Sequence, residues 1–289
     1  MTLAIPISAS SERRRRIVAS PGAWLVWGSV TFFFVMLAGV IGSVVVSSFG
    51  SRWFDTWLPA SWTTQWYGQA WHEFTLLDVL VVTVEISLLV VAISVVVGVP
   101  ASYVLARRSF PGRRLLYLMF LLPILMPPIT YGIPLATVLY KWGFAGNMSG
   151  VVLANLVPSI PFVILTMTPF IEQVDPAIER AARMCGARTW QVFLRILAPL
   201  LVPGILAASI LVLVRTVGMF ELTFLTAGPD SQTLVVALYY TMSAAGIRAQ
   251  QSVDAMAVIY TSMMLVLLVV ALRFVNPTQL VARVKEDPA

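Results

Sequence analysis

Long apolar runs dominate the pattern of hydrophobic and polar positions along this chain. Six runs are present, at residues 23–49, 79–106, 115–140, 151–171, 200–225 and 255–275. Each is long enough to cross the hydrocarbon core of a membrane as a helix, which takes about 20 residues. Barrel strands are shorter and alternate with a period of two, whereas these runs are continuous. The pattern therefore predicts an all-α membrane protein with six transmembrane helices.

The third run is unusual because it is rich in proline, with Pro123, Pro127, Pro128 and Pro134. Proline lacks a backbone N–H and kinks or breaks a helix. Such breaks persist in a membrane where neighbouring helices or water satisfy the freed backbone groups. We expect either a packing kink or a hinge in this span.

Basic residues set the predicted orientation. With the N-terminus in the cytoplasm, 15 of the 19 Lys and Arg residues lie on inside segments and 3 on outside segments, and Arg215 lies within a span. Cytoplasmic loops of membrane proteins carry this excess of positive charge. Both termini are therefore predicted to be cytoplasmic. The same bias accounts for the net charge of +6, so we expect no nucleic-acid partner.

The segments between the runs give the domain organisation. We expect a basic cytoplasmic tail over 1–22, a first transmembrane helix over 23–49, an aromatic periplasmic loop over 50–78, a five-helix core over 79–275 with a cytoplasmic loop over 172–199, and a cytoplasmic tail over 276–289. No signal-peptide cleavage site closes the first run, so we expect it to remain as a span. The tryptophans of the outer loop fit an interfacial anchor or a docking face for an external partner.

Composition excludes several function classes. Hydrophobic residues make up 59% of the chain and charged residues 11%, which does not fit an ordinary soluble enzyme. One cysteine, Cys185, and one histidine, His72, exclude an internal disulfide and a multi-histidine metal site. Neither Lys141 nor Lys285 completes a phosphate-binding loop of the GxxxxGK[ST] type. We therefore expect no cofactor in this chain and any ATP and Mg to be held by a partner.

The cytoplasmic loop over 172–199 is more than a connector. Asp175 followed by Pro176 is a helix-start signal, and the residues that follow favour helix. Gly186 can end that helix, and a second apolar stripe begins at Trp190. The sequence thus predicts a short helix, a glycine corner and a second helix that runs into the fifth span. A structured knob of this kind suits a groove on a soluble partner.

This loop resembles the cytoplasmic EAA loop of binding-protein-dependent ABC importer permeases, the type I importer family. When the loop is aligned on Gly186, the Ala-Ala pair falls on Ala181 and Ala182, Ile on Ile196 and Pro on Pro199. The usual Glu falls on Arg180, with Glu179 one place earlier. The resemblance implies that the residues contacting the ATPase are Glu179, Arg180, Ala181, Ala182, Gly186, Ala187, Ile196 and Pro199.

The resemblance also implies the assembly. It implies the type I ABC importer permease fold and a place in the bacterial inner membrane. The partners would be two cytoplasmic ATPase subunits, a second and different permease chain, an extracytoplasmic solute-binding protein and membrane lipid. Segments such as Gln65-Trp66-Tyr67-Gly68 and Thr226-Ala227-Gly228-Pro229 look most like the polyamine, phosphonate and ferric-ion branch. A polyamine or related polar organic solute is then the expected substrate, with phosphonate, ferric ion or another anion as the alternative.

Three charged residues fall well inside the predicted spans, Glu85, Arg215 and Glu221, whereas Arg273 stands at the end of the last one. Charges at membrane depth usually face a protein interior or an aqueous path. They are candidates for the substrate path, or for a structural pair between Arg215 and one of the acids. Arg215 suits an anion or zwitterion better than a polycation. A channel or a transporter driven by an ion gradient is the alternative class, and it would give the cytoplasmic loop no purpose.

Overall fold

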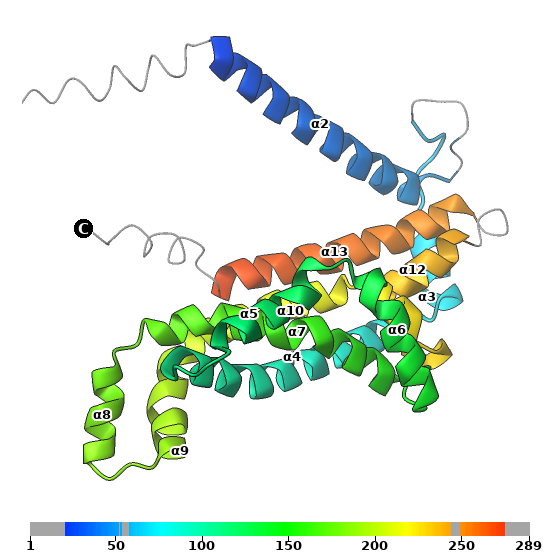
Figure 1. The fold of residues 1–289 in the computed structure, drawn as a ribbon. Helices are drawn as coiled ribbons and strands as arrows, with labels where there is room; N and C mark the ends of the chain where they lie inside the picture. The colour runs from blue at the N-terminus through cyan, green and yellow to red at the C-terminus, as the bar shows by residue number, and fades with distance from the viewer. Residues whose placement is uncertain (1–20, 52, 54–57, 244–248, 275–289) are drawn as a thin grey trace, which may run out of the picture.

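The computed structural model describes residues 21–51, 53, 58–243 and 249–274. In this part of the chain the structure is built from helices, and only the isolated bridge between Gly50 and Trp62 has strand pairing. The predicted tails and the arginines at 13–16, 52, 248 and 283 lie outside the described residues. Figure 1 shows a bundle of long helices with a helical hairpin projecting from one end.

The long apolar helices match the predicted spans, and the expectation of an all-α membrane protein is confirmed. Five helices are long and apolar enough to cross a membrane, and one bent helix pair brings the number to six. The single spans are α2 (Pro21–Phe49), α4 (Leu76–Arg107), α7 (Met148–Glu172), the helix that continues into α10 (Ala198–Val217) and α13 (Gln250–Phe274).

The third span is broken rather than only kinked. It consists of α5 (Arg113–Leu125) and α6 (Pro128–Lys141), whose axes differ by 97°. Pro127 and Pro128 stand at the break, where neither residue can donate a backbone hydrogen bond. The four prolines thus predict an irregularity in this span, but neither its position nor its angle, because Pro123 and Pro134 lie inside α5 and α6.

The fifth span ends earlier than the predicted run over 200–225. The helix α10 ends at Val217, and a separate short helix, α11 (Glu221–Thr226), follows after a break. Hydropathy alone does not locate this break, because apolar residues continue beyond it into α11. The segment then passes through η2 (Pro229–Ser231) and α12 (Leu234–Ser243) to the last span.

The core lies where α4 packs along α7. The cluster there includes the buried residues Ile86, Val90, Val163 and Met167. A Cβ atom added at Gly98 would lie 2.7 Å from Cγ1 of Val163, so α4 and α7 approach as closely as they do only because this position is glycine. This packed pair supports the cytoplasmic hairpin at one end.

The outer end is closed by the short helix α3 (Gln65–Glu73). The indole Nε1 of Trp66 donates to the carbonyl of Gly50 at 2.7 Å, and Tyr67 hydrogen-bonds Ser48 at 2.8 Å. Trp62 and Trp71 are exposed. The predicted aromatic loop therefore divides into rings that fasten α2 to the body and rings left on the surface.

Candidate coupling surface and translocation path

The cytoplasmic hairpin forms as its sequence predicts. The helix α8 (Pro176–Met184) begins at Asp175, whose carboxylate accepts a hydrogen bond from the backbone N–H of Ala177 at 2.8 Å. Gly186 has a φ of +84°, and no atom lies within 4 Å of the place where its Cβ would be. The corner therefore requires glycine for its backbone conformation and not for space.

The second arm of the hairpin runs without interruption into the fifth span. It comprises α9 (Thr189–Val192) and the π-helical turn η1 (Phe193–Leu197), followed directly by α10. The backbone N–H of Arg188 donates to Oε1 of Gln191 at 2.7 Å and fixes the start of α9. A displacement of α8 would therefore reach the membrane through one continuous helix.

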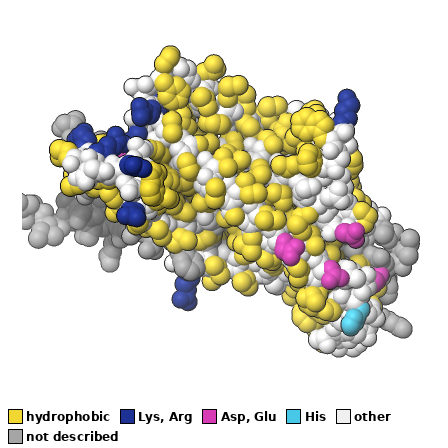
Figure 2. All heavy atoms as spheres, turned by 90° about the horizontal axis from the view of Figure 1, so that it is seen from below, with side chains coloured by type: hydrophobic (Ala, Val, Ile, Leu, Met, Phe, Trp, Pro, Cys, Tyr) yellow, Lys and Arg dark blue, Asp and Glu magenta, His cyan; other side chains and the backbone are white. Residues whose placement is uncertain are grey.

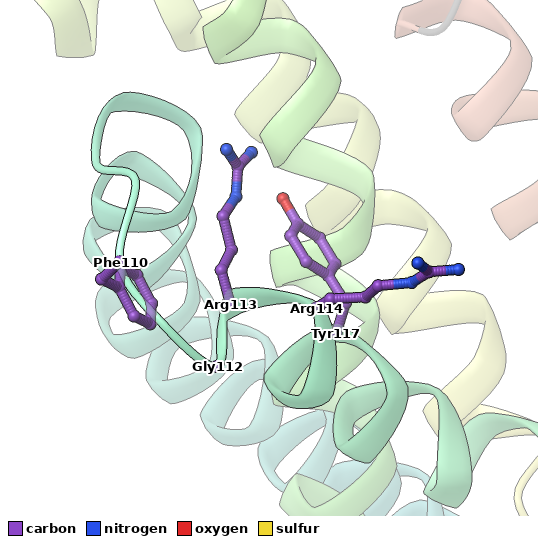
Figure 3. Close-up of a pocket in the computed structure, with 5 residues that line it drawn as sticks. All are labelled: Phe110, Gly112, Arg113, Arg114 and Tyr117. Atoms are coloured by element: carbon purple, nitrogen blue, oxygen red, sulfur yellow. The ribbon is translucent and has the colours of Figure 1, made fainter.

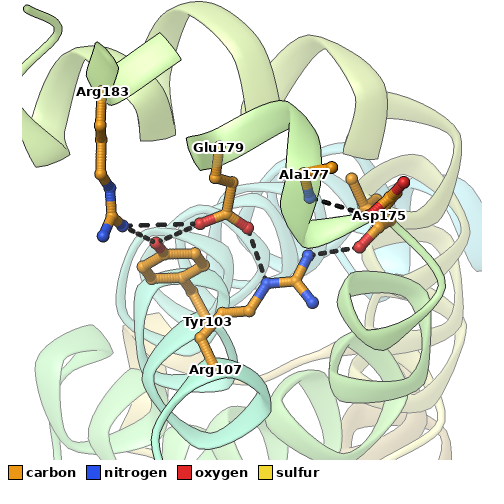
Figure 4. A network of polar contacts seen from close by, with 7 residues as sticks. Tyr103, Arg107, Asp175, Ala177, Glu179 and Arg183 are labelled. Carbon is orange, nitrogen blue, oxygen red and sulfur yellow. Dashed lines mark hydrogen bonds and ion pairs between the residues drawn. The ribbon is translucent and has the colours of Figure 1, made fainter. Parts of the chain in front are cut away.

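Glu179 ties α8 to the cytoplasmic end of α4. Its carboxylate accepts a hydrogen bond from the hydroxyl of Tyr103 at 2.8 Å and pairs with Nε of Arg107 at 2.7 Å (Figure 4). Arg183 approaches the same carboxylate at 3.7 Å. The side chain of Glu179 is only 6% exposed. This acid is therefore turned inward, toward the permease itself.

Arg107 has a second role at the base of the hairpin. Its guanidinium also donates to the backbone carbonyl of Val174 at 2.6 Å. One arginine on α4 thus holds both the start of the loop and the acid on α8. Next to it lies a small pocket of about 190 Å³, and four of its eight lining residues are arginines. Its lining consists of Tyr103, Arg107, Arg108, Pro176, Glu179, Arg180, Arg183 and Thr189.

The outward face of the hairpin carries the other predicted contact residues. Arg180, Ala181, Gly186 and Pro199 are exposed. The remaining three, Ala182, Ala187 and Ile196, are partly buried. Met184, which the sequence did not single out, has 83% of its surface exposed. The hairpin therefore presents both cationic and apolar side chains to a partner.

A second, open pocket lies at the turn that joins the second and third spans. It has a volume of about 590 Å³ and is lined by Phe110, Gly112, Arg113, Arg114 and Tyr117 (Figure 3). Arg113 is paired with Glu172 of α7 at 3.0 Å and lies over the ring of Tyr117. This turn therefore also fastens the third span to α7 on the cytoplasmic side.

Charge is distributed unevenly along the molecule. Figure 2 shows most of the visible Lys and Arg side chains at the end with the hairpin, and acidic side chains near the single histidine at the opposite end. This polarity agrees with a cytoplasmic hairpin under the positive-inside rule.

The three ionisable residues predicted within spans do not come together as an ion pair. Among the described residues, no carboxylate lies within ion-pairing distance of Arg215, and Glu85 and Glu221 are likewise without a basic partner. Arg215 donates to the carbonyl of Pro158 at 3.4 Å and lies over the ring of Phe162. Glu85 is exposed on α4, and Glu221 is partly buried at the start of α11. A cation is thus held inside the bundle by a carbonyl and a ring.

Several site residues were missed from the sequence. Tyr103 and Arg107 lie more than 70 residues from Glu179 along the chain, so no local pattern connects them. An aromatic cluster forms around the break after α10, where the ring of Phe220 lies 5.2 Å from Phe224 and 4.9 Å from Tyr239. Helical spacing predicts the first of these contacts, because the two residues are four apart.

Comparison with known proteins gives concordant results. A family model described as "Binding-protein-dependent transport system inner membrane component" matches residues 98–277. The chain is 31% identical over 175 residues to the molybdenum transport system permease protein ModB of Escherichia coli (strain K12), covering 55% of this chain and 76% of that one. It is 30% identical over 172 residues to the sulfate transport system permease protein CysW of Synechocystis sp. (strain ATCC 27184 / PCC 6803 / Kazusa), covering 55% and 62%.

Similarity in fold extends over nearly the whole chain. A solved structure described as a bacterial ABC transporter involved in the import of the acidic polysaccharide alginate contains a chain that aligns with a TM-score of 0.67. The alignment covers 98% of this chain and 100% of that one at 18% identity.

Proposed function

Because the chain belongs to the family of binding-protein-dependent transport system inner membrane components, and is a multi-pass permease subunit of an ABC importer, we propose that it imports a small oxyanion. In this proposal the chain forms half of the solute path. A solute-binding protein delivers the substrate, a second and different permease chain forms the other half, and two cytoplasmic ATPase subunits hold ATP and Mg. This division of labour needs no catalytic residue in the chain.

The observation that carries the substrate proposal is Arg215. It lies inside the fifth span, partly buried, and no carboxylate among the described residues neutralises it. An unpaired cation inside a membrane protein is costly unless it faces water or meets an anion. Two relatives are named for molybdenum and sulfate, which fits an oxyanion such as molybdate or sulfate. Both points argue against the polyamine expected from the sequence.

Glu85 and Glu221 take different places in this proposal. Glu221 opens α11 directly after the break in the fifth span, so it stays a candidate for the path. Glu85 is exposed on α4. We propose that Glu85 contacts the second permease chain or lipid headgroups rather than the substrate.

The hairpin supports the proposed coupling. ATPase closure would press on α8, and the continuous helix from Thr189 to Val217 would carry the displacement into the membrane. The exposed residues Arg180, Ala181 and Gly186 would touch the ATPase. The buried Glu179 would instead hold α8 on α4. The permease then alternates between outward and inward states as a set of rigid bodies.

The test has two steps. The chain is first purified from its native membrane in mild detergent, and the proteins that accompany it are identified by mass spectrometry. An ATPase, a second permease and a solute-binding protein are expected. The assembled importer is then placed in liposomes, and ATP-driven uptake of radiolabelled sulfate, molybdate and spermidine is compared.

Substitution of Arg215 tests the path. We expect Arg215→Met to reduce oxyanion uptake at least tenfold and Arg215→Lys to retain part of it. Arg273→Met, at the exposed cytoplasmic end of α13, is the matched control and should transport normally. Spermidine uptake, or full oxyanion uptake by Arg215→Met, would refute the substrate proposal.

A further inference from the structure

The base of the cytoplasmic hairpin carries more positive than negative side chains, and not all of the positive ones are paired within the fold. The pocket of about 190 Å³ at its base is lined by four arginines: Arg107, Arg108, Arg180 and Arg183. The lining contains a single carboxylate, that of Glu179.

That carboxylate is already matched from within the permease. Arg107 pairs with it at 2.7 Å and Arg183 lies at 3.7 Å (Figure 4). Its side chain is 6% exposed, so it presents almost no negative charge to a partner. The acid of this pocket is therefore matched inside the permease, whereas the other two acids of the loop, Glu172 and Asp175, lie outside the pocket lining.

Arg180 and Arg108 remain unmatched. Both are exposed, and among the described residues neither has a carboxylate within ion-pairing distance. Exposed arginines repel one another, and a partner that supplies negative charge lowers this repulsion.

The neighbouring surface is apolar. Met184 is 83% exposed and Ile178 is 42% exposed on the same short helix. A flexible, exposed methionine is a common contact residue at protein interfaces. Met184 is four residues after Arg180, so an exposed apolar side chain lies one helical turn from this arginine.

We propose that the ATPase subunit that receives this hairpin presents carboxylate side chains to Arg180 and Arg108, around an apolar slot for Met184. This inference rests on the proposed function, since it specifies the surface of the ATPase that the permease engages. It makes recognition specific: an ATPase whose groove is basic at this place would be rejected.

The test uses the scarcity of lysine in this chain. Only Lys141 and Lys285 are present, and Lys141 lies at the outer end of α6. The variant Arg180→Lys keeps the positive charge and adds an amine. A carbodiimide joins an amine to a carboxylate in direct contact as an amide, with loss of water. We expect mass spectrometry of the assembled importer to find Lys at 180 joined to an Asp or Glu of the ATPase.

Charge reversal gives the quantitative readout. Permease and ATPase are titrated in lipid nanodiscs at low and high salt. Arg180→Glu is expected to weaken ATPase binding by about tenfold or more at low salt and to flatten its salt dependence. Arg114→Glu is the control, because Arg114 is equally exposed on the cytoplasmic side but lies outside this pocket. An unchanged melting temperature shows that Arg180→Glu folds.

The outcomes separate the two proposals. If an ATPase accompanies the wild-type importer but Arg180→Lys gives no crosslink to it and Arg180→Glu binds it normally, the acidic surface is wrong and the permease function stands. If Arg180→Glu loses binding to anionic vesicles and not to the ATPase, the face is a lipid contact and the inference is overturned. If no ATPase binds the wild-type chain, the proposed function itself fails and the inference falls with it.

Discussion

Breaking the ion pair between Arg107 and Glu179 should release α8 from α4. The two side chains are 13% and 6% exposed, so the pair is well shielded from water. Removing one partner of a buried pair leaves an uncompensated charge and typically destabilises by about 3–5 kcal/mol. Glu179 retains Tyr103 and Arg183 as partners, so we take the lower end, about 3 kcal/mol, for Arg107→Met.

Amide hydrogen exchange of the purified full chain measures this release. The substitution should destabilise the state in which α8 is packed on α4 by about 3 kcal/mol relative to the state in which α8 is released. This corresponds to about 150-fold faster amide exchange in α8. The matched control is Arg113→Met. Its pair with Glu172 is 33% and 48% exposed, so its loss should change exchange by no more than about fivefold.

A double substitution isolates the pair itself. Glu179→Gln added to Arg107→Met removes the orphaned charge, and part of the lost protection should return. Equal exchange in Arg107→Met and Arg113→Met would refute the reasoning, because burial would then have no bearing on how the hairpin is held.

Three further substitutions test the packing and the corner. Gly186→Val should reach the membrane in normal amount but lose ATP-driven uptake, since a non-glycine residue at φ +84° is strained by about 1–2 kcal/mol, whereas Gly186→Asn should retain uptake. Gly98→Ala should lower thermal stability by about 1–3 kcal/mol, because its Cβ would lie 2.7 Å from Val163, while Gly68→Ala meets open space and should not. Asp175→Ala should speed exchange in the first turn of α8 by about fivefold, through loss of about 1 kcal/mol of capping, and unchanged exchange there would contradict the cap.

Sequence patterns predict the elements of this protein better than their contacts. The start of α8 at Pro176 and the corner at Gly186 are local properties, and each is where the sequence places it. The direction of Glu179 is not local. It depends on Arg107 of α4, which lies 72 residues away along the chain and within 3 Å in space.

The breaks in the spans show a similar limit. Prolines reveal a weakness in the third span, but the 97° between α5 and α6 depends on what the two pieces pack against. The break after Val217 has no proline, and hydropathy alone does not separate α11 from the span that the run over 200–225 predicts. Hydropathy reports where a chain prefers lipid and not where its backbone turns.

The bend between α5 and α6 also has a mechanical consequence. Pro127 and Pro128 have no N–H groups, so a change of angle there breaks no hydrogen bond donated by either residue. Beyond the bend, α6 is packed tightly on α11, since a Cβ at Gly132 would lie 3.0 Å from both Leu222 and Leu225.

We predict that the angle at this bend changes during transport while α5 and α6 each stay intact. Distances between spin labels on α5 and α6, measured with and without ATP, would show whether the angle changes during transport. If it does, the free energy needed to change the angle is small here, because Pro127 and Pro128 donate no backbone hydrogen bonds that would have to break.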